Sequence, residues 1–220
     1  MKDCTDLMRP EEGEGLPYRI YVPENYDIES KYPLVLYLHG MGERGSDNRL
    51  QTSVNSVMQT LLEPENRAAY PCVVLAPQCP DDGFWAEEYL EMLMGLLERA
   101  RAAYSIDPAR IYIMGLSMGG FGTWGMLAAY PDYFAAAVPV CGGGNAEAAA
   151  LFKYVPVWAF HGTLDTVVFP CGSRDMVKAM AEAGPRELRY TEYPDEQHSS
   201  WERAWREPGL FPWMFAQAKE

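Results

Sequence analysis

Short, continuous apolar runs separated by mixed segments dominate the pattern along this chain. Five such runs, each closed by glycine or proline, occupy residues 32–38, 72–76, 111–114, 135–140 and 155–160. Strands that are buried on both faces carry continuous apolar runs, because helices cover both faces of a parallel sheet. The pattern therefore predicts a parallel sheet between two layers of helices.

The segments around these runs complete an alternating order of strand and helix. Residues 18–22 alternate like a half-exposed strand, and residues 188–193 are expected to form the last strand. Leu90, Leu93 and Leu97 recur at helical spacing in the segment 87–104. Further helices are expected over residues 121–130, 174–183 and 210–219. This order predicts a doubly wound, mostly parallel α/β fold.

The chain is expected to form one domain over residues 1–220, because its length suffices for one substantial core. Residues 1–17 are expected to form a poorly ordered N-terminal segment. Residues 41–66 make the longest polar insertion between strands, and we expect a loop and a helix there, near the functional site. The segments between strands are too short to hold a large lid domain.

Charge and hydropathy exclude several classes of partner. The formal net charge is -13, so the chain lacks the basic patches that nucleic-acid binding requires. No apolar stretch is long enough to span a membrane, and the N-terminus lacks the apolar core of a signal peptide. We expect a cytoplasmic protein with no membrane partner. A secreted mature form whose export signal was removed stays open, as does the oligomeric state.

The five cysteines form no metal-binding pattern. They are odd in number, contain no C-x-x-C pair and lie near no histidine cluster, so buried free thiols are expected and a structural metal site is not. A disulfide between Cys72 and Cys79, which flank one predicted strand end, is the alternative.

The segment 110–120 runs from a β-prone stretch into Gly115-Leu116-Ser117-Met118-Gly119 and then into a predicted helix. This is the form of a nucleophile elbow, a tight turn that presents the serine Oγ clear of the backbone. Gly115 and Gly119 provide the residues without side-chain bulk that such a turn needs. Ser117 is therefore the candidate nucleophile.

Elimination selects the partners of Ser117. His39 and His161 close buried strands and are expected to be structural, whereas His198 lies in a polar loop after the last strand and is the expected base. Asp165 follows a buried strand at the edge where open α/β sheets place their sites. Asp195 is its rival for the role of acid, but the chain order of serine, aspartate and histidine favours Asp165.

Two main-chain N–H groups are expected to form an oxyanion hole, at Met118 and in the glycine-rich loop at Met41. That loop lacks the lysine and the spacing of phosphate-binding loops. Glu43 and Arg44 in the same loop are expected to form a local ion pair, and binding of substrate is their alternative role.

These motifs together resemble the α/β-hydrolase superfamily. They comprise Leu38-His39-Gly40-Met41-Gly42-Glu43-Arg44-Gly45, Ala76-Pro77-Gln78, the elbow, His161-Gly162 with Asp165, and His198-Ser199-Ser200-Trp201. Within it the chain is most similar to single-domain serine esterases related to feruloyl esterases and polyhydroxybutyrate depolymerase-like enzymes. Catalytic domains of prolyl oligopeptidases share much of the pattern. Met41 is bulkier than the residue such oxyanion loops usually carry.

The resemblance implies a carboxylic-ester hydrolase that works through an acyl-enzyme and requires no metal or organic cofactor. Trp85 and Trp201 are expected to line the substrate groove, with packing in the core as their alternative. A short acyl or hydroxycinnamoyl (feruloyl or acetyl) ester, free or linked to a plant polysaccharide, is the expected substrate. The alternatives are a prolyl-oligopeptidase-like serine peptidase and a noncatalytic carbohydrate-binding protein on the same fold.

Overall fold

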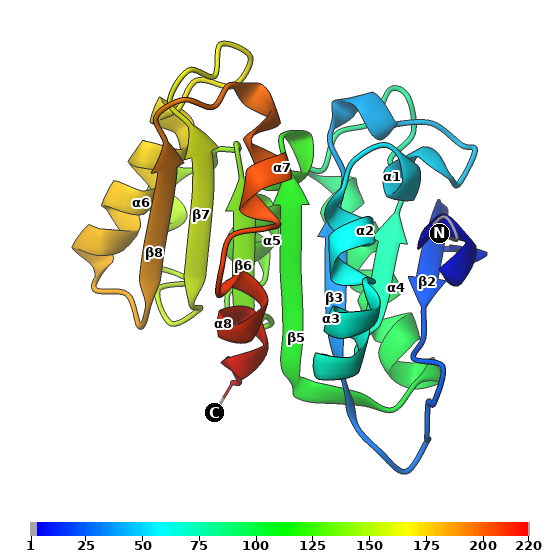
Figure 1. Cartoon of the computed structure of the whole chain (residues 1–220). Coiled ribbons are helices and arrows are strands. Elements are labelled where there is room, and N and C mark those ends of the chain that lie inside the picture. Colours follow the sequence, from blue (N-terminus) through cyan, green and yellow to red (C-terminus); the bar gives the residue numbers. More distant parts are fainter. Residues whose placement is uncertain (1–3, 220) are drawn as a thin grey trace.

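One eight-stranded sheet runs through the protein, with helices on both faces (Figure 1). The computed structural model describes residues 4–219, and residues 1–3 and 220 lie outside it. The strands lie in the order β1 (Arg9–Gly13), β2 (Leu16–Tyr21), β4 (Val73–Pro77), β3 (Tyr32–Leu38), β5 (Ile106–Leu116), β6 (Ala136–Val140), β7 (Val157–Gly162) and β8 (Leu188–Tyr193). The strands from β4 to β8 pair in parallel, as predicted, and β2 is antiparallel to both of its neighbours.

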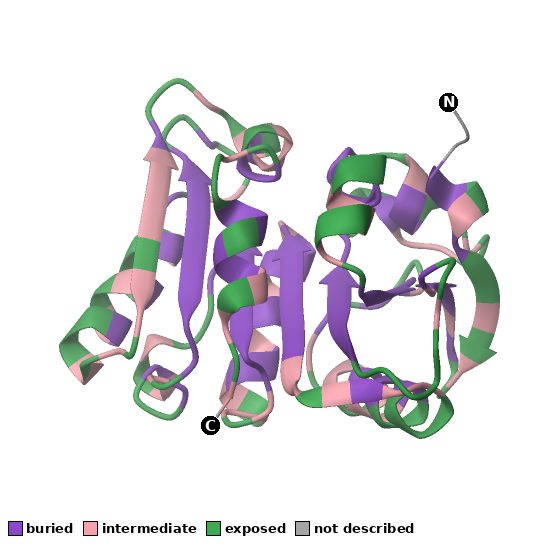
Figure 2. Cartoon of the chain, turned by 60° about the horizontal axis from the view of Figure 1, so that its bottom comes forward, coloured by how far each residue is buried: buried purple, intermediate pink, exposed green. Residues whose placement is uncertain are grey.

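Strand β3 shows why the central runs are continuously apolar. Leu34, Leu36 and Leu38 belong to a core shared with α4 (Glu88–Ala103), α5 (Met118–Ala129) and α6 (Cys171–Ala183). Val35 and Tyr37 belong to a second core, shared with α2 (Val57–Leu61), α7 (Trp201–Ala204) and α8 (Leu210–Ala216). Both sets are fully buried, because successive side chains point to opposite faces and each face is covered (Figure 2).

The polar insertion forms more helix than predicted. It contains the 3-10 helix η2 (Met41–Glu43) and three short helices, namely α1 (Leu50–Ser53), α2 and α3 (Pro64–Ala69). Val57, Met58 and Leu61 of α2 are buried against the sheet, and Pro64 begins α3 at a position that needs no N–H donor. Met41, Gly42 and Glu43 of η2 line the cleft that is described below.

The N-terminal segment is held in the sheet by strand pairing, whereas we expected residues 1–17 to be poorly ordered. Residues 4–7 form η1 (Cys4–Leu7), and β1 pairs antiparallel with β2 from Arg9↔Ile20 to Gly13↔Leu16. The turn at Glu14 and Gly15 has two positive φ angles, 54° and 78°, the conformation that matches the twist of a two-residue hairpin. Residues 1–3 of that prediction lie outside the described part of the chain.

Cys72 and Cys79 are not joined to each other, so the alternative of a disulfide between them is not realised. Four of the five cysteines are buried as expected, but Cys171 at the start of α6 is exposed. Among the helices within residues 4–219, none has the length and apolar character needed to cross a bilayer.

Four parallel strands bring distant parts of the chain to one edge. Strands β3, β5 and β7 end there at Leu38, Leu116 and Gly162, and the segment after β8 returns to the same edge (Figure 1). Loops at the carboxyl ends of parallel strands carry the sites of open α/β sheets.

Candidate active site

Ser117 lies in a strained turn between β5 and α5. Its φ and ψ are 52° and -117°, a conformation that costs a non-glycine residue about 1–3 kcal/mol. Its N–H donates to Val140 O at 3.0 Å, which ties the turn to β6. A Cβ on Gly119 would lie 1.9 Å from Leu38 O, and one on Gly115 would lie 2.3 Å from Gly119 O. Glycine is therefore required on both sides of the serine.

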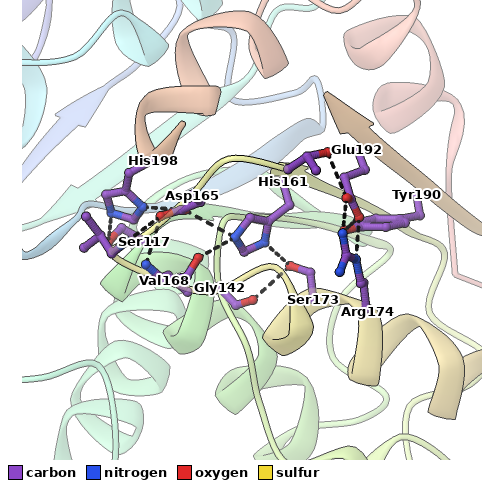
Figure 3. A network of polar contacts seen from close by, with 12 residues as sticks. Ser117, Gly142, His161, Asp165, Val168, Ser173, Arg174, Tyr190, Glu192 and His198 are labelled. Carbon is purple, nitrogen blue, oxygen red and sulfur yellow. Dashed lines mark hydrogen bonds and ion pairs between the residues drawn. The ribbon is translucent and has the colours of Figure 1, made fainter. Parts of the chain in front are cut away.

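Ser117, His198 and Asp165 form a hydrogen-bonded chain (Figure 3). Ser117 Oγ lies 2.9 Å from His198 Nε2, and His198 Nδ1 lies 2.7 Å from Asp165 Oδ2. A carboxylate only accepts hydrogen bonds, so Nδ1 carries the ring hydrogen and Nε2 of the neutral ring accepts from the serine hydroxyl. The arrangement can therefore move a proton from Ser117 to His198 while Asp165 holds the ring.

The backbone after β7 fixes Asp165. Its side chain is buried, and Oδ1 accepts hydrogen bonds from the N–H groups of Val167 and Val168 at 2.8 and 3.0 Å. Asp195, the rival in the sequence, has a side chain that is 73% exposed and pairs with Arg203 at 3.0 Å. The structure brings Asp165, not Asp195, to His198.

A mainly apolar cleft of about 540 Å³ opens over Ser117 and His198. Its other lining residues come from the oxyanion loop, the segment before α4, the elbow and α5, the loop after β7 and the start of α7. They are Gly40, Met41, Gly42, Glu43, Phe84, Leu116, Met118, Phe121, Val167, Val168 and Trp201. Both predicted oxyanion residues, Met41 and Met118, thus border the same space as the nucleophile.

His39 holds the loop that leads to Met41. The ring is fully buried, its Nε2 accepts from the Cys79 N–H at 2.9 Å, and its Nδ1 donates to Gly40 O at 2.6 Å. Burial lowers the pKa of His39 to about 4, so the ring is neutral at pH 7 and these two bonds fix one tautomer. The structural role expected for His39 is thus to orient the backbone between Gly40 and Met41.

Glu43 and Arg44 do not form the ion pair that we expected. Arg44 donates instead to the carbonyl oxygens of Met41 and Gly83, both at 3.2 Å. Glu43 is buried with Oε2 3.9 Å from His39 Nδ1, and burial raises the pKa of its carboxyl group. The loop is thus closed by an arginine that bonds to backbone oxygens.

The two tryptophans expected in the groove have different positions. Trp201 lines the cleft, and its ring lies edge-on to His198 with centroids 5.2 Å apart. Trp85 is only 1% exposed, and its Nε1 donates to His39 O at 3.0 Å. The prediction that Trp85 lines the groove is therefore wrong, because this indole is used to pack and bond beneath the oxyanion loop.

Sequence reasoning missed the apolar walls of the cleft. Phe84, Phe121, Val167 and Val168 line it, and Phe84 takes the place expected for its neighbour Trp85. Two adjacent aromatic residues in a loop indicated that one ring would face outward, but not which one. The apolar pair Val167-Val168 after Asp165 was a second signal in the sequence, because it lies in a segment between a buried strand and a helix. The structure leaves Val167 69% exposed there.

Within residues 4–219, one group of three side chains could approach a metal ion together. Ligand atoms of Cys141, Asp165 and His198 lie within 4.8 Å of one another. Burial raises the pKa of the Cys141 thiol well above its usual range, and only a thiolate is a good metal ligand. Asp165 and His198 are already bonded to each other. The donor set therefore suits proton transfer better than metal binding.

Comparison with known proteins matches this chain to several esterases. The Esterase family model, described as "Putative esterase", matches residues 12–145. The chain is 28% identical over 215 residues to a bifunctional acetylxylan esterase/xylanase of Neocallimastix patriciarum, covering 90% of this chain and 29% of that protein. It is 28% identical over 182 residues to "Probable feruloyl esterase C" of Aspergillus terreus, covering 76% of this chain and 62% of that protein.

A solved thermostable esterase is similar over nearly the whole chain. The two superpose with a TM-score of 0.93 and 36% identity, covering 98% of this chain and 64% of the solved one. The chain therefore spans less than two thirds of each of these three proteins.

Proposed function

Because this chain belongs to the esterase family and has the α/β-hydrolase fold, we propose that it hydrolyses carboxylic esters through an acyl-enzyme on Ser117. The observation that carries the proposal is the continuous hydrogen-bonded path from Ser117 Oγ through His198 to Asp165, at 2.9 and 2.7 Å. Serine is a weak nucleophile unless a base accepts its proton as it attacks.

Each step of the proposed reaction uses a side chain or a main-chain N–H group of the candidate active site. Ser117 Oγ attacks the ester carbonyl carbon while His198 Nε2 takes the hydroxyl proton, and Asp165 stabilises the imidazolium that forms. The main-chain N–H groups of Met41 and Met118 stabilise the developing oxyanion. His198 then gives its proton to the leaving alcohol, and water attacks the acyl-enzyme by the same route to release the acid.

The start of α5 supports the proposed place of the oxyanion. Met118 is the first residue of this twelve-residue helix, directly after Ser117. Unpaired N–H groups and the helix dipole make a helix N-terminus favourable for negative charge. Negative charge that develops above Ser117 therefore meets a positive end of the helix.

The walls of the cleft favour a short or aromatic acyl group. Phe84, Phe121 and Trp201 offer flat apolar surfaces in the cleft that Ser117 borders, in a volume within the usual range for small-molecule sites. The acetylxylan esterase and feruloyl esterase relatives agree with this choice. We therefore propose acetyl or hydroxycinnamoyl esters, including those linked to plant polysaccharides, as substrates.

Hydrolysis of methyl ferulate, acetylated xylan, p-nitrophenyl acetate and p-nitrophenyl palmitate by the wild type and Ser117→Ala tests the proposal. The wild type should cleave at least one of the first three, and the variant should lose at least about 10³-fold in kcat with an unchanged unfolding temperature. A fluorophosphonate probe should label the wild type only. Cleavage of palmitate alone would contradict the substrate class, and an active Ser117→Ala would contradict the mechanism.

A further inference from the structure

A second buried histidine lies behind Asp165, on the side away from His198 (Figure 3). His161 belongs to β7 and is fully buried. Its Nε2 lies 3.3 Å from Asp165 Oδ2 and 2.9 Å from Val168 O. Its Nδ1 lies 2.7 Å from Ser173 Oγ on α6. The proton transfer proposed above makes no direct use of this ring.

The acceptors around His161 determine where its hydrogen lies. A carbonyl oxygen and a carboxylate oxygen can only accept, so Nε2 carries the hydrogen and directs it between Val168 O and Asp165 Oδ2. Burial lowers the pKa of His161, which favours the neutral ring. Nδ1 lies 2.7 Å from Ser173 Oγ, whose single hydroxyl hydrogen is shared with Gly142 O at 2.9 Å, so contacts on both nitrogens hold the plane of the ring.

The two oxygens of Asp165 are held in different ways. Oδ1 accepts from two backbone N–H groups, at Val167 and Val168. Within residues 4–219, the polar contacts of Oδ2 are with the two histidines. His198 belongs to the short 3-10 helix η4 (His198–Ser200), with a side chain that is 20% exposed. His161, by contrast, is fixed in a central strand. His161 is therefore the rigid contact of Oδ2, the oxygen that accepts the hydrogen bond from His198 Nδ1.

We propose that His161 is a positioning residue for the ester hydrolysis proposed above, and that its Nε2–H keeps Asp165 Oδ2 directed at His198 Nδ1. Loss of this N–H lets the carboxylate rotate away from the line to His198. The base is then held less often in the orientation that accepts the Ser117 proton, so turnover falls while substrate binding does not.

A matched pair of variants isolates the N–H group. In His161→Gln the amide nitrogen can donate from near the place of Nε2, whereas His161→Met has a side chain of the same length and no donor. We expect His161→Gln to keep kcat within about 5-fold of the wild type and His161→Met to lose at least about 20-fold, with KM unchanged within about 3-fold in both. Equal kcat values in two folded variants would overturn the proposal.

A second readout does not depend on turnover. The proton between His198 Nδ1 and Asp165 Oδ2 should give a downfield NMR resonance, because this hydrogen bond is short and charge-assisted. We expect the resonance to persist in His161→Gln and to shift or broaden in His161→Met. An unshifted resonance in His161→Met contradicts the positioning role, whereas a wild type that cleaves no ester contradicts only the proposed function.

Ser173→Ala provides the test if both variants at position 161 unfold. It removes the hydroxyl 2.7 Å from Nδ1 and leaves the Nε2–H in place. The looser ring should lower kcat by about 5-fold at constant KM and shift the same resonance. Unchanged kcat and an unchanged resonance in this variant would overturn the proposal.

Discussion

At the scale of single residues, the site depends on the difference between two aspartates. Asp165 is enclosed by backbone donors and two histidines, whereas Asp195 lies in the same loop as His198 but pairs with Arg203 at the surface. Asp195 is nearer to His198 along the chain. Asp165, however, follows the end of β7, and this position brings its carboxylate to the His198 ring.

Asp165→Asn and Asp195→Asn should therefore behave differently. The amide at position 165 can hold His198 in the wrong tautomer, so we expect a loss of about 10³–10⁴ in kcat with little change in fold. Asp195→Asn removes an exposed ion pair and should stay within about 2-fold of the wild type. Steady-state kinetics on one ester compares them, and equal losses would contradict the assignment of Asp165 as the acid.

His39 predicts a pH dependence of stability. Its pKa is lowered from an ordinary 6.5 to about 4 in the folded protein, so below pH 6.5 the unfolded chain binds a proton that the folded chain does not. Stability from this residue is thus complete above pH 6.5 and declines toward pH 4. We expect the difference in free energy of unfolding between the wild type and His39→Gln to shrink by about 1.5 kcal/mol between pH 6.5 and 5.

Urea unfolding at both pH values measures that difference. Other titrating groups contribute equally to both proteins, so they cancel in the comparison. A difference that stays constant with pH would mean that His39 takes up a proton in the folded state.

At the scale of elements, the oxyanion loop is built to present a backbone group. Gly40 has an extended conformation, with φ and ψ of -81° and 178°, and Met41 is the first residue of η2. Proline is tolerated at the first position of a helix, and the residue before it prefers such an extended conformation. The loop can therefore accept proline at position 41.

Met41→Pro and Met41→Ala separate the backbone from the side chain. Proline removes the N–H, so we expect kcat to fall by about 10²–10³-fold. Alanine keeps the N–H and should leave kcat within about 3-fold, whereas KM should change with the acyl group because the Met41 side chain borders the cleft. Similar losses in the two variants would show that the side chain, not the N–H, matters.

The elements differ in how well the sequence predicts them. Strands β3 and β8 have the predicted bounds, since their patterns are ended by glycine, proline or polar residues on either side. Strand β1 was missed, because Arg-Pro-Glu-Glu-Gly has little β-propensity and pairs only through its backbone with β2. Trp85 was misplaced because the packing of a loop, and not its composition, decides which of two neighbouring aromatic rings is buried.

At the scale of the whole molecule, every substrate approaches a protein with a net negative charge. The chain has 31 acidic and 18 basic side chains. Among the described residues that line the cleft, none is a lysine or an arginine. Long-range repulsion of anions is therefore not offset at the site itself.

An ester that carries a free carboxylate should be a poorer substrate than a neutral one of similar size. We expect kcat/KM for methyl butyrate to exceed that for monomethyl succinate, and the ratio to fall by about 3-fold or more when salt rises from about 10 mM to about 500 mM. Initial rates at both salt concentrations test this. A ratio that does not change with salt would mean that local contacts, not net charge, set the preference.

The two outer strands also affect how copies of the molecule meet one another. β1 carries Pro10, which has no N–H to offer, between charged neighbours, and β8 carries Arg189 and Glu192. A strand from another molecule would have to bury those charges to extend the sheet at either end. Removing β1 would uncover β2, whose Leu16, Tyr18 and Ile20 belong to the core, so the shortened chain should be prone to aggregate.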